Sequence, residues 1–383
     1  MFEIVEVQNN GTVIKVVGVG GAGGNAVDHM IRNAVQGVEF IAMNTDAKAL
    51  AHGLAKNQIQ LGASGLGAGA KPEAGRAAAL EMREHIEEAL QGAHMVFITA
   101  GMGGGTGTGA APLVAEVAKQ MEILTVAVVT KPFSFEGPKR MQSAESGIDE
   151  LAQHVDSVIV ILNEKLEEIL GEDVLMKEAF SSADDVLKKA VAGISEIINI
   201  HGLISVDFQD VKTVMHEQGM AMMGSASASG MDRARIAAEE AVACPLLEGV
   251  NLSGARGILV NITAAENSLK LRETREVMET IRSFAADDAT VILGAVYDEN
   301  MGDELRVTVV ATGLGQPAAI RQTKPQLVVK NGTDNMAVSG VDYGLLDSMP
   351  AVIRKNRAST IEALQQNGMD KYDIPAFLRK QAD

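Results

Sequence analysis

The sequence predicts an α/β protein in which a Rossmann-like domain on a parallel sheet is joined by a long helix to a smaller α+β domain. Three observations predict this class. Short apolar runs alternate with helical patterns through residues 12–162, one long stretch at 182–199 keeps a helical period, and a second alternation occupies residues 231–312. Alternation of this kind is typical of βαβ units around a parallel sheet.

The first half supplies the predicted parallel sheet. Strands are expected at residues 12–17, 38–43, 95–100, 124–129 and 158–162, and helices at 25–36, 77–90 and 110–121. The first of these helices carries Val27, Met30 and Ile31 on one face, and Gly37 provides its C-terminal stop. Its apolar stripe is therefore expected to pack on the sheet.

The stretch from Ser182 to Asn199 is predicted to be a connecting helix. Its apolar stripe is broad enough to contact two bodies and consists of Val186, Leu187, Ala190, Val191, Ile194, Ile197 and Ile198. Beyond it, a smaller sheet covered by helices is expected, with helices at 231–243 and 268–285 and strands at 257–263, 290–297 and 305–312. The expected segments are a sheet domain (1–181), the connecting helix (182–202), a second domain (203–316), a flexible linker (317–370) and a terminal peptide (371–383).

Composition excludes several classes of function. The chain has 383 residues, of which 46% are hydrophobic and 22% charged, so it is expected to fold into a globular protein. Its net charge of −17 argues against nucleic acid or anionic lipid as partners, because both are polyanions. Cys244 is the one cysteine and the seven histidines have no paired spacing, so neither a disulfide nor a protein-ligated metal is expected. With no signal peptide and no apolar stretch near the roughly 20 residues that cross a bilayer, the chain is expected to stay in the cytoplasm without inserting into a membrane.

The helix and strand patterns end after Gly313. Residues 316–340 mix Pro, Gly, Gln, Asn, Lys and Thr without a period, which indicates a linker. A short segment near the end of the sequence carries Ile374, Phe377 and Leu378 beside two basic residues. Such a hydrophobic cluster either binds a partner or folds back on the body of the protein.

A first glycine run, Gly18 to Gly24, follows the first strand and opens the first helix. Its glycines allow a sharp turn that brings backbone amides against a phosphate at the helix N-terminus. The run fits the GxGxxG pattern of dinucleotide-binding domains, which also require an acidic residue about 20 positions further on. Glu39 and Asp46 keep that interpretation open.

A second glycine run, Gly103 to Gly109, lies between a predicted strand and a predicted helix. A dinucleotide-binding domain has no use for it. Two amide-rich loops at the carboxyl ends of neighbouring strands form one concave anion site, to which Thr106 and Thr108 add hydroxyl donors. The chain has no Gly-Lys pair, so a Walker A loop is excluded. The alternative is that these glycines only form tight turns.

These motifs together resemble a known family. The run GGGTGTG resembles the tubulin signature, and with GVGGAGGNA at 18–26, MNTD at 43–46 and TKPFSFEGPKR at 130–140 the chain resembles the bacterial cell-division GTPases of the tubulin/FtsZ family. The resemblance covers about residues 10–316 and returns in the terminal segment DIPAFLRK. It implies a tubulin/FtsZ-like fold with GTP bound to the first domain.

The resemblance implies a nucleotide site with a phosphate end and a base end. Glu136 would lie at the ribose and Arg140 near the α-phosphate, although the two could simply form a surface ion pair. Asp184 can accept from both N1–H and the 2-amino group of guanine, whereas adenine presents no such donor pair; its alternative role is to cap the connecting helix. The phosphate and loop positions are Gly20, Gly21, Ala22, Asn44, Thr45, Asp46, Gly101, Gly104, Gly105, Thr106, Gly107 and Thr108, and the base pocket is formed by Asn25, Asn163, Phe180 and Asp184.

Neither glycine run supplies a general base for hydrolysis. Asp207 and Asp210 stand three positions apart at the entry to a helix, so both can occupy one exposed edge. From the residues alone, the favoured account is Asp207 as an N-cap and Asp210 at the positive end of the helix dipole. The resemblance instead implies that this loop completes the active site of the next subunit in a filament.

The resemblance therefore implies an enzyme that converts GTP to GDP and phosphate and polymerises head to tail into the division ring at midcell. A loop at one end that serves a pocket at the other end propagates into an open polymer. Mg²⁺ is expected on the phosphates, mainly through water. The terminal peptide would bind membrane-tethering adaptors such as FtsA or ZipA through Ile374, Pro375, Phe377 and Leu378.

Two departures from the family pattern keep alternatives open. Ser205 and Lys71 stand where Asn is usual or common in the family. A shorter hydroxyl at 205 reaches a substrate through water rather than directly, which puts the hydrolysis rate in question. The Ser205 departure keeps a non-hydrolysing scaffold of the same fold as one alternative, and the first glycine run keeps an NAD-dependent oxidoreductase as the other.

Overall fold

The strands in the described part of the chain form one mixed sheet. The computed structural model describes residues 11–171, 173–199, 202–217, 219–243, 255–286 and 288–314, and all of them belong to a compact unit that ends at Ala319. The ten strands pair in the order β3-β2-β1-β4-β5-β6-β7-β10-β8-β9. Those of the first half run parallel and are β1 (Ile14–Val19), β2 (Glu39–Asn44), β3 (Asn57–Gln60), β4 (Met95–Gly101), β5 (Leu124–Lys131) and β6 (Ser157–Leu162).

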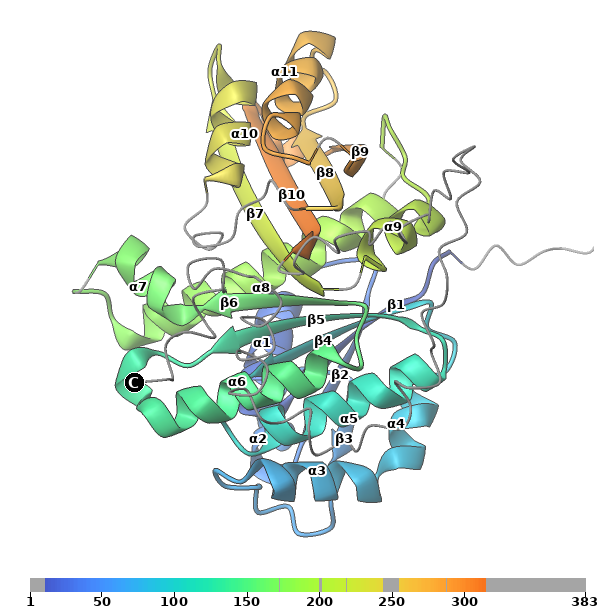
Figure 1. Cartoon of the computed structure of the whole chain (residues 1–383), viewed down its shortest axis with the longest axis vertical. Helices are drawn as coiled ribbons and strands as arrows, with labels where there is room; N and C mark the ends of the chain where they lie inside the picture. The colour runs from blue at the N-terminus through green and yellow to red at the C-terminus, as the bar shows by residue number, and fades with distance from the viewer. Residues whose placement is uncertain are drawn as a thin grey trace, which may run out of the picture. The chain divides into compact units, whose positions relative to one another are not determined.

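Helices cover both faces of this parallel sheet, as Figure 1 shows with α5 and α6 in front of the strands and α1 behind them. The first-half helices are α1 (Gly20–Arg32), α2 (Ala47–His52), α3 (Pro72–Glu81), α4 (Arg83–Leu90), α5 (Thr106–Gln120), α6 (Pro138–Ala152) and α7 (Asn163–Leu170). Neighbouring strand residues point to opposite faces, so Val16 joins the core with α1 while Val17 joins the core with α5. Continuous apolar runs are therefore favourable in these strands, because both faces are buried.

The second half continues the same sheet. α8 (Met176–Asn199) leads into α9 (Phe208–Met215) and then into β7 (Gly219–Ser229), which pairs with β6 in parallel. β10 (Glu304–Leu314) lies antiparallel between β7 and β8 (Gly257–Ala264), and β9 (Thr290–Tyr297) forms the edge. α10 (Arg233–Val242) and α11 (Leu271–Arg282) pack with these strands in a separate apolar cluster. The two halves are thus joined both by α8 and by the β6–β7 pair.

Strand order determines where the two glycine runs lie. β1 and β4 are hydrogen-bonded neighbours, and Val19, the last residue of β1, is in register with Ala100, the residue before the end of β4. The strands are parallel, so the chain leaves both of them at the same edge of the sheet. The glycine run that opens α1 and the one that precedes α5 therefore begin side by side.

The structure confirms the predicted fold class and differs from the predicted elements in several places. The helix expected at 77–90 is two helices, α3 and α4, which meet at Met82. β3, β7, α2, α6 and α7 were not predicted. β7 was missed because residues 219–229 are mainly Gly, Ala, Ser and Met, a composition that resembles a loop. Pairing with both β6 and β10 outweighs this weak local preference.

The division into domains stays a prediction. The linker at 317–370 and the terminal peptide at 371–383 lie outside the described residues, and so do Ile374, Pro375, Phe377 and Leu378. In the part of the chain that the structure describes, no helix has the length and apolar character needed to cross a membrane.

A buried ion pair ties the second half together. Arg233, at the start of α10, is 5% exposed, and Glu273, in the first turn of α11, is 3% exposed. Arg233 donates to the Glu273 carboxylate through Nε at 2.8 Å and through Nη2 at 3.1 Å. The same guanidinium group donates through Nη1 to the carbonyl of Asp303 and through Nη2 to the carbonyl of Ser268. Burial alone would raise the pKa of the Glu273 carboxyl, but hydrogen bonds from Arg233 and from the Lys270 amide hold it below its usual value.

We expect Arg233→Met to destabilise the protein by about 3–5 kcal/mol, because it leaves the Glu273 carboxylate buried without a counter-charge. Urea unfolding gives the free energy of unfolding directly. The double variant Arg233→Met/Glu273→Gln also removes the unpaired carboxylate charge, so it should recover part of the lost free energy of unfolding. A single variant as stable as the wild type would contradict this role.

Candidate nucleotide-binding site

A cavity of about 300 Å³ adjoins the loops that follow β1, β4 and β5. The start of α1, the loop before α5, the segment 130–140, the start of α7 and the first half of α8 all contribute to its wall. It brings together most of the predicted nucleotide-binding residues, namely Gly21, Ala22, Asn25, Gly101, Gly104, Gly105, Thr106, Gly107, Glu136, Arg140, Asn163, Phe180 and Asp184. These residues come from five segments spread over more than 160 positions of the sequence.

The two glycine loops approach each other too closely for side chains. A Cβ at Gly20, whose φ is +76°, would lie 3.0 Å from the amide nitrogen of Gly107, and a Cβ at Gly101 would lie 2.6 Å from the Cβ of Ala22. Gly21 and Gly104 are different, because a Cβ there would meet nothing within 4 Å. The backbones are therefore tightly packed behind the cavity and open toward it, which suits a polyphosphate held by amides at the N-termini of α1 and α5.

Five predicted positions do not line the cavity and instead support its walls. The Thr108 hydroxyl accepts from the Gly103 amide at 2.8 Å, which closes the second loop. Thr45 and Thr106 share a hydrogen bond of 2.6 Å between their hydroxyls, which ties the end of β2 to the start of α5. The remaining positions are Gly20, at the turn into α1, Asn44, whose Oδ1 accepts from the Asp46 amide, and Asp46, which caps α2.

One end of the cavity is suited to a planar base. Phe180 of α8 is 43% exposed and meets the ring of Phe133 edge-on at a centroid distance of 5.3 Å. Asn163, at the start of α7, is 4% exposed, and among the described residues its Oδ1 has no hydrogen-bond partner. A buried acceptor without a partner is costly, so the geometry fits a ligand that brings a donor to this position.

Asp184 has an unusual protonation equilibrium. Burial beside the cavity raises the pKa of its carboxyl from 3.8 to about 6, and the positive charge of Arg32 offsets part of that rise. At neutral pH the group is still an anion, and a ligand that donates to both carboxylate oxygens would relieve its desolvation. Its predicted alternative role as a helix cap does not apply, because α8 begins eight residues earlier at Met176.

Glu136 and Arg140 form the ion pair that the sequence left open. Arg140 Nη1 lies 2.6 Å from Glu136 Oε2, and Glu136 Oε1 accepts from the Phe133 amide at 3.0 Å. Both residues nevertheless line the cavity. Because both Glu136 oxygens are engaged, this carboxylate is poorly placed to act as a general base.

Asp207 and Asp210 lie outside the cavity, at the N-terminus of α9. Asp207 is the N-cap, and its Oδ1 accepts from the Asp210 amide at 2.8 Å, as the sequence alone predicted. Asp210 is exposed, and its carboxylate has no hydrogen bond or ion pair to any residue that the structure describes. Asp210 is therefore the freer of the two acids.

Sequence reasoning missed six lining residues, which are Gly69, Met102, Thr130, Pro132, Ala183 and Leu187. Only Gly69 had a readable signal, since it ends the glycine-rich stretch 62–69.

The dinucleotide interpretation fails on geometry. Glu39 starts β2, at the edge of the sheet opposite the glycine loops, and faces Lys15 Nζ at 3.5 Å, while Asp46 is engaged as a helix cap.

Comparisons with known proteins agree with this geometry. The Tubulin/FtsZ family GTPase domain matches residues 13–171, and the FtsZ family C-terminal domain matches residues 219–315. Cell division protein FtsZ of Pseudomonas aeruginosa is 57% identical over 400 residues and covers 100% of both chains, and its counterpart in Coxiella burnetii is 52% identical over 99% of both. A solved structure of an empty FtsZ dimer from M. jannaschii is 45% identical, with a TM-score of 0.75 over 80% of this chain and 89% of that one.

The fold and the site thus define a GTPase of the tubulin/FtsZ class. Within this class, the chain belongs to the FtsZ family. It is therefore a guanine-nucleotide-binding enzyme and a polymerising cytoskeletal protein of cell division. This membership excludes the oxidoreductase alternative.

The raised pKa of Asp184 predicts how nucleotide binding depends on pH. If Asp184 holds the base, guanine donates to its carboxylate form, so affinity for GDP should fall by about tenfold per unit as the pH drops below 6 and the carboxyl takes up a proton. Fluorescence titration between pH 5 and 8 measures this. The terminal phosphate of GDP takes up a proton in the same pH range, so Asp184→Asn is the control. If GDP affinity falls equally steeply with pH in the variant and in the wild type, the assignment of Asp184 to the base is contradicted.

Proposed function

We propose that this chain binds GTP in the cavity between its two glycine loops and hydrolyses it only when Asp210 and Asp207 of an adjoining subunit complete the site. Phosphates would be held by the amides around Gly21 and Gly104, and the base by Asp184 and Phe180. Asn163 would supply the acceptor that otherwise has no partner. This proposal adds residue roles and a shared site to the GTPase activity of the family.

The proposal rests on the separation of the cavity from the acidic loop, which is the segment 202–210 that carries Asp207 and Asp210. Asp184 lines the cavity, and α8 continues for 15 residues to Asn199 before the acidic loop begins. At 1.5 Å per residue, about 22 Å of rigid helix lies between them. Phe208, the first residue of α9, also lies against the ring of His94, which precedes β4 at the edge of the sheet opposite the glycine loops. A subunit's own Asp210 therefore cannot approach the phosphates that its own glycine loops hold.

The cavity also lacks a base of its own. Its acidic lining consists of Glu136, which is engaged by Arg140 and by a backbone amide, and Asp184, which stands on α8 at the base end. A water molecule that attacks the terminal phosphate needs a group that positions and polarises it. An exposed acid on a neighbouring subunit meets this need, and Asp210 is such an acid.

Exposed apolar side chains support a head-to-tail contact. The acidic loop exposes Leu203 at 62% and Ile204 at 39%. Around the cavity, Leu66, Phe135 and Leu175 are exposed at 88%, 60% and 65%, on segments that also contribute or adjoin lining residues. Two different apolar surfaces of this kind fit a heterologous contact, which repeats into an open filament.

The finer parts of the assignment rest on family resemblance. Mg²⁺ would bind the phosphates and supply positive charge there, with water as most of its ligands; no group of three or more His, Cys, Asp or Glu suited to a metal ion occurs among the described residues. The filament would form the division ring in the cytoplasm at midcell. Adaptors such as FtsA or ZipA would bind Ile374, Pro375, Phe377 and Leu378 at the end of a flexible tether of residues 317–370.

A shared site makes hydrolysis depend on protein concentration. Phosphate release per molecule should rise sharply above a threshold concentration, because isolated subunits lack the acidic residues. Asp210→Ala should still bind GTP but turn it over at least about 100-fold more slowly, which is the loss expected for a missing general base. Gln209→Ala, the exposed neighbour on the same helical turn, is the matched control and should keep wild-type turnover.

Activity strictly proportional to concentration down to high dilution would contradict the shared site. Full activity of Asp210→Ala would contradict the role of that carboxylate. Polymerisation with GTP but without phosphate release would instead indicate a filament scaffold.

A further inference from the structure

Helix α9, which carries the two acids at its N-terminus, is anchored at its other end by side chains from distant elements. The Ser157 hydroxyl of β6 donates to the carbonyl of Met215 at 2.7 Å, and the Thr312 hydroxyl of β10 donates to the carbonyl of Val214 at 2.7 Å. Both bonds are buried. They satisfy carbonyls that a helix C-terminus leaves without partners.

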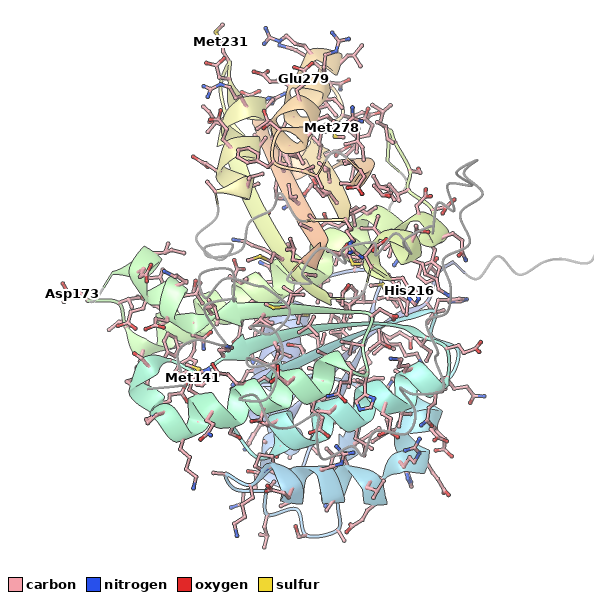
Figure 2. All side chains as sticks on the ribbon, in the orientation of Figure 1. Met141, Asp173, His216, Met231, Met278 and Glu279 are labelled. Atoms are coloured by element: carbon pink, nitrogen blue, oxygen red, sulfur yellow. The ribbon has the colours of Figure 1, made fainter. Side chains whose placement is uncertain are left out.

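A third anchor lies at the surface. His216, the residue that ends α9, has Nδ1 2.9 Å from Asp156 Oδ1, and Figure 2 shows it at this end of the helix. The Asp156 side chain is only 19% exposed, and it is itself fixed, because its Oδ2 accepts from the Thr125 amide at 2.8 Å. His216 therefore attaches α9 to a carboxylate that β5 holds rigidly.

Because α9 is a rigid helix, a change of its angle at the anchored end moves the acids near its start. The helix has eight residues, or about 12 Å, between His216 and the acids at its start. Asp210 lies six residues, or about 9 Å, from His216, so rotation by about 10° around the anchored end would displace it by about 1.6 Å. Misplacing a reacting group by about 1 Å can lower a rate by about 100-fold.

We propose that His216 and Asp156 are positioning residues for GTP hydrolysis: their bond holds α9 at the angle at which Asp210 and Asp207 meet the GTP of the adjoining subunit. This inference rests on the proposed shared site. His216 itself touches no nucleotide, since it lies at the far end of α9 from the acids and does not line the cavity. The pair therefore affects turnover in the filament and leaves nucleotide binding unchanged.

The test compares His216→Ala with His216→Asn in the full-length chain. Asparagine places a side-chain nitrogen close to the position of Nδ1 and can still donate to Asp156, whereas alanine cannot. His216 is exposed, with 64% of its side chain accessible, so neither change should disturb folding. Thr213→Ala is the matched control, because Thr213 is also exposed on α9 and its hydroxyl bonds only to the carbonyl of Gln209 within the helix.

The measurements are kcat and KM for phosphate release well above the assembly threshold, GTP affinity of the dilute subunit, and the melting temperature. We expect His216→Ala to lower kcat by about three- to tenfold, less than the full effect of a misplaced group because two buried anchors remain. KM, GTP affinity and melting temperature should stay at wild-type values. His216→Asn should restore most of kcat, and Thr213→Ala should not change it.

Three results would overturn the inference: wild-type kcat in His216→Ala, equal losses in the Ala and Asn variants, or a fall in GTP affinity and melting temperature that accompanies the loss of kcat. Asp210→Ala in the same assay separates this inference from the proposed function. If Asp210→Ala is inactive while His216→Ala is fully active, only the positioning role fails. If Asp210→Ala is fully active, the shared site fails as well.

Discussion

The close approach of two glycine loops is the constraint on which the rest of the structure depends. β1 and β4 are parallel neighbours, so the chain leaves both at one edge of the sheet, and Gly20 and Gly107 bring the following turns into backbone contact. Side chains are excluded from this contact, which leaves amides as the groups that face the cavity. In a chain with a net charge of −17, backbone amides at two helix N-termini provide a local site for an anion without a cluster of basic residues.

α8 links this site to assembly. Its first half supplies Phe180 and Asp184 to the cavity, and its far end leads to the acidic loop and α9. In the proposed shared site, the helix that contributes to the base pocket also keeps Asp207 and Asp210 away from it. A lone subunit would then be a slow enzyme, and each subunit contact formed in the filament would add a complete site.

The sequence predicted those parts of the fold and the site that depend on local pattern. Continuous apolar strands, glycine runs after β1 and β4 and the long period of α8 are all local, and each was found where it was expected or within a few residues. What it missed depends on contacts between distant residues. β7 is a strand because β6 and β10 pair with it, and Thr108 closes its own loop rather than lining the cavity because Gly103 is within reach.

Side-chain partnerships were beyond prediction for the same reason. His216 and Asp156 are 60 positions apart, and no spacing rule connects them. The pKa of Asp184 could not be foreseen either, because it depends on how deeply α8 is buried beside α1. Asp207 caps α9, as local rules require, and one of its oxygens remains available for the role proposed above.

The most direct test of the glycine contact is GTP binding, by equilibrium dialysis, to Gly20→Ala and Gly24→Ala. At Gly20, which has a φ of +76°, a methyl group would lie 3.0 Å from the amide nitrogen of Gly107 in the other loop, whereas at Gly24 it meets nothing within 4 Å. If the two loops form one site, Gly20→Ala should weaken GTP binding by about tenfold or more, equivalent to about 1.4 kcal/mol or more, while Gly24→Ala binds as the wild type does. Equal, undiminished binding by both variants would show that the contact between the loops is not what holds the nucleotide.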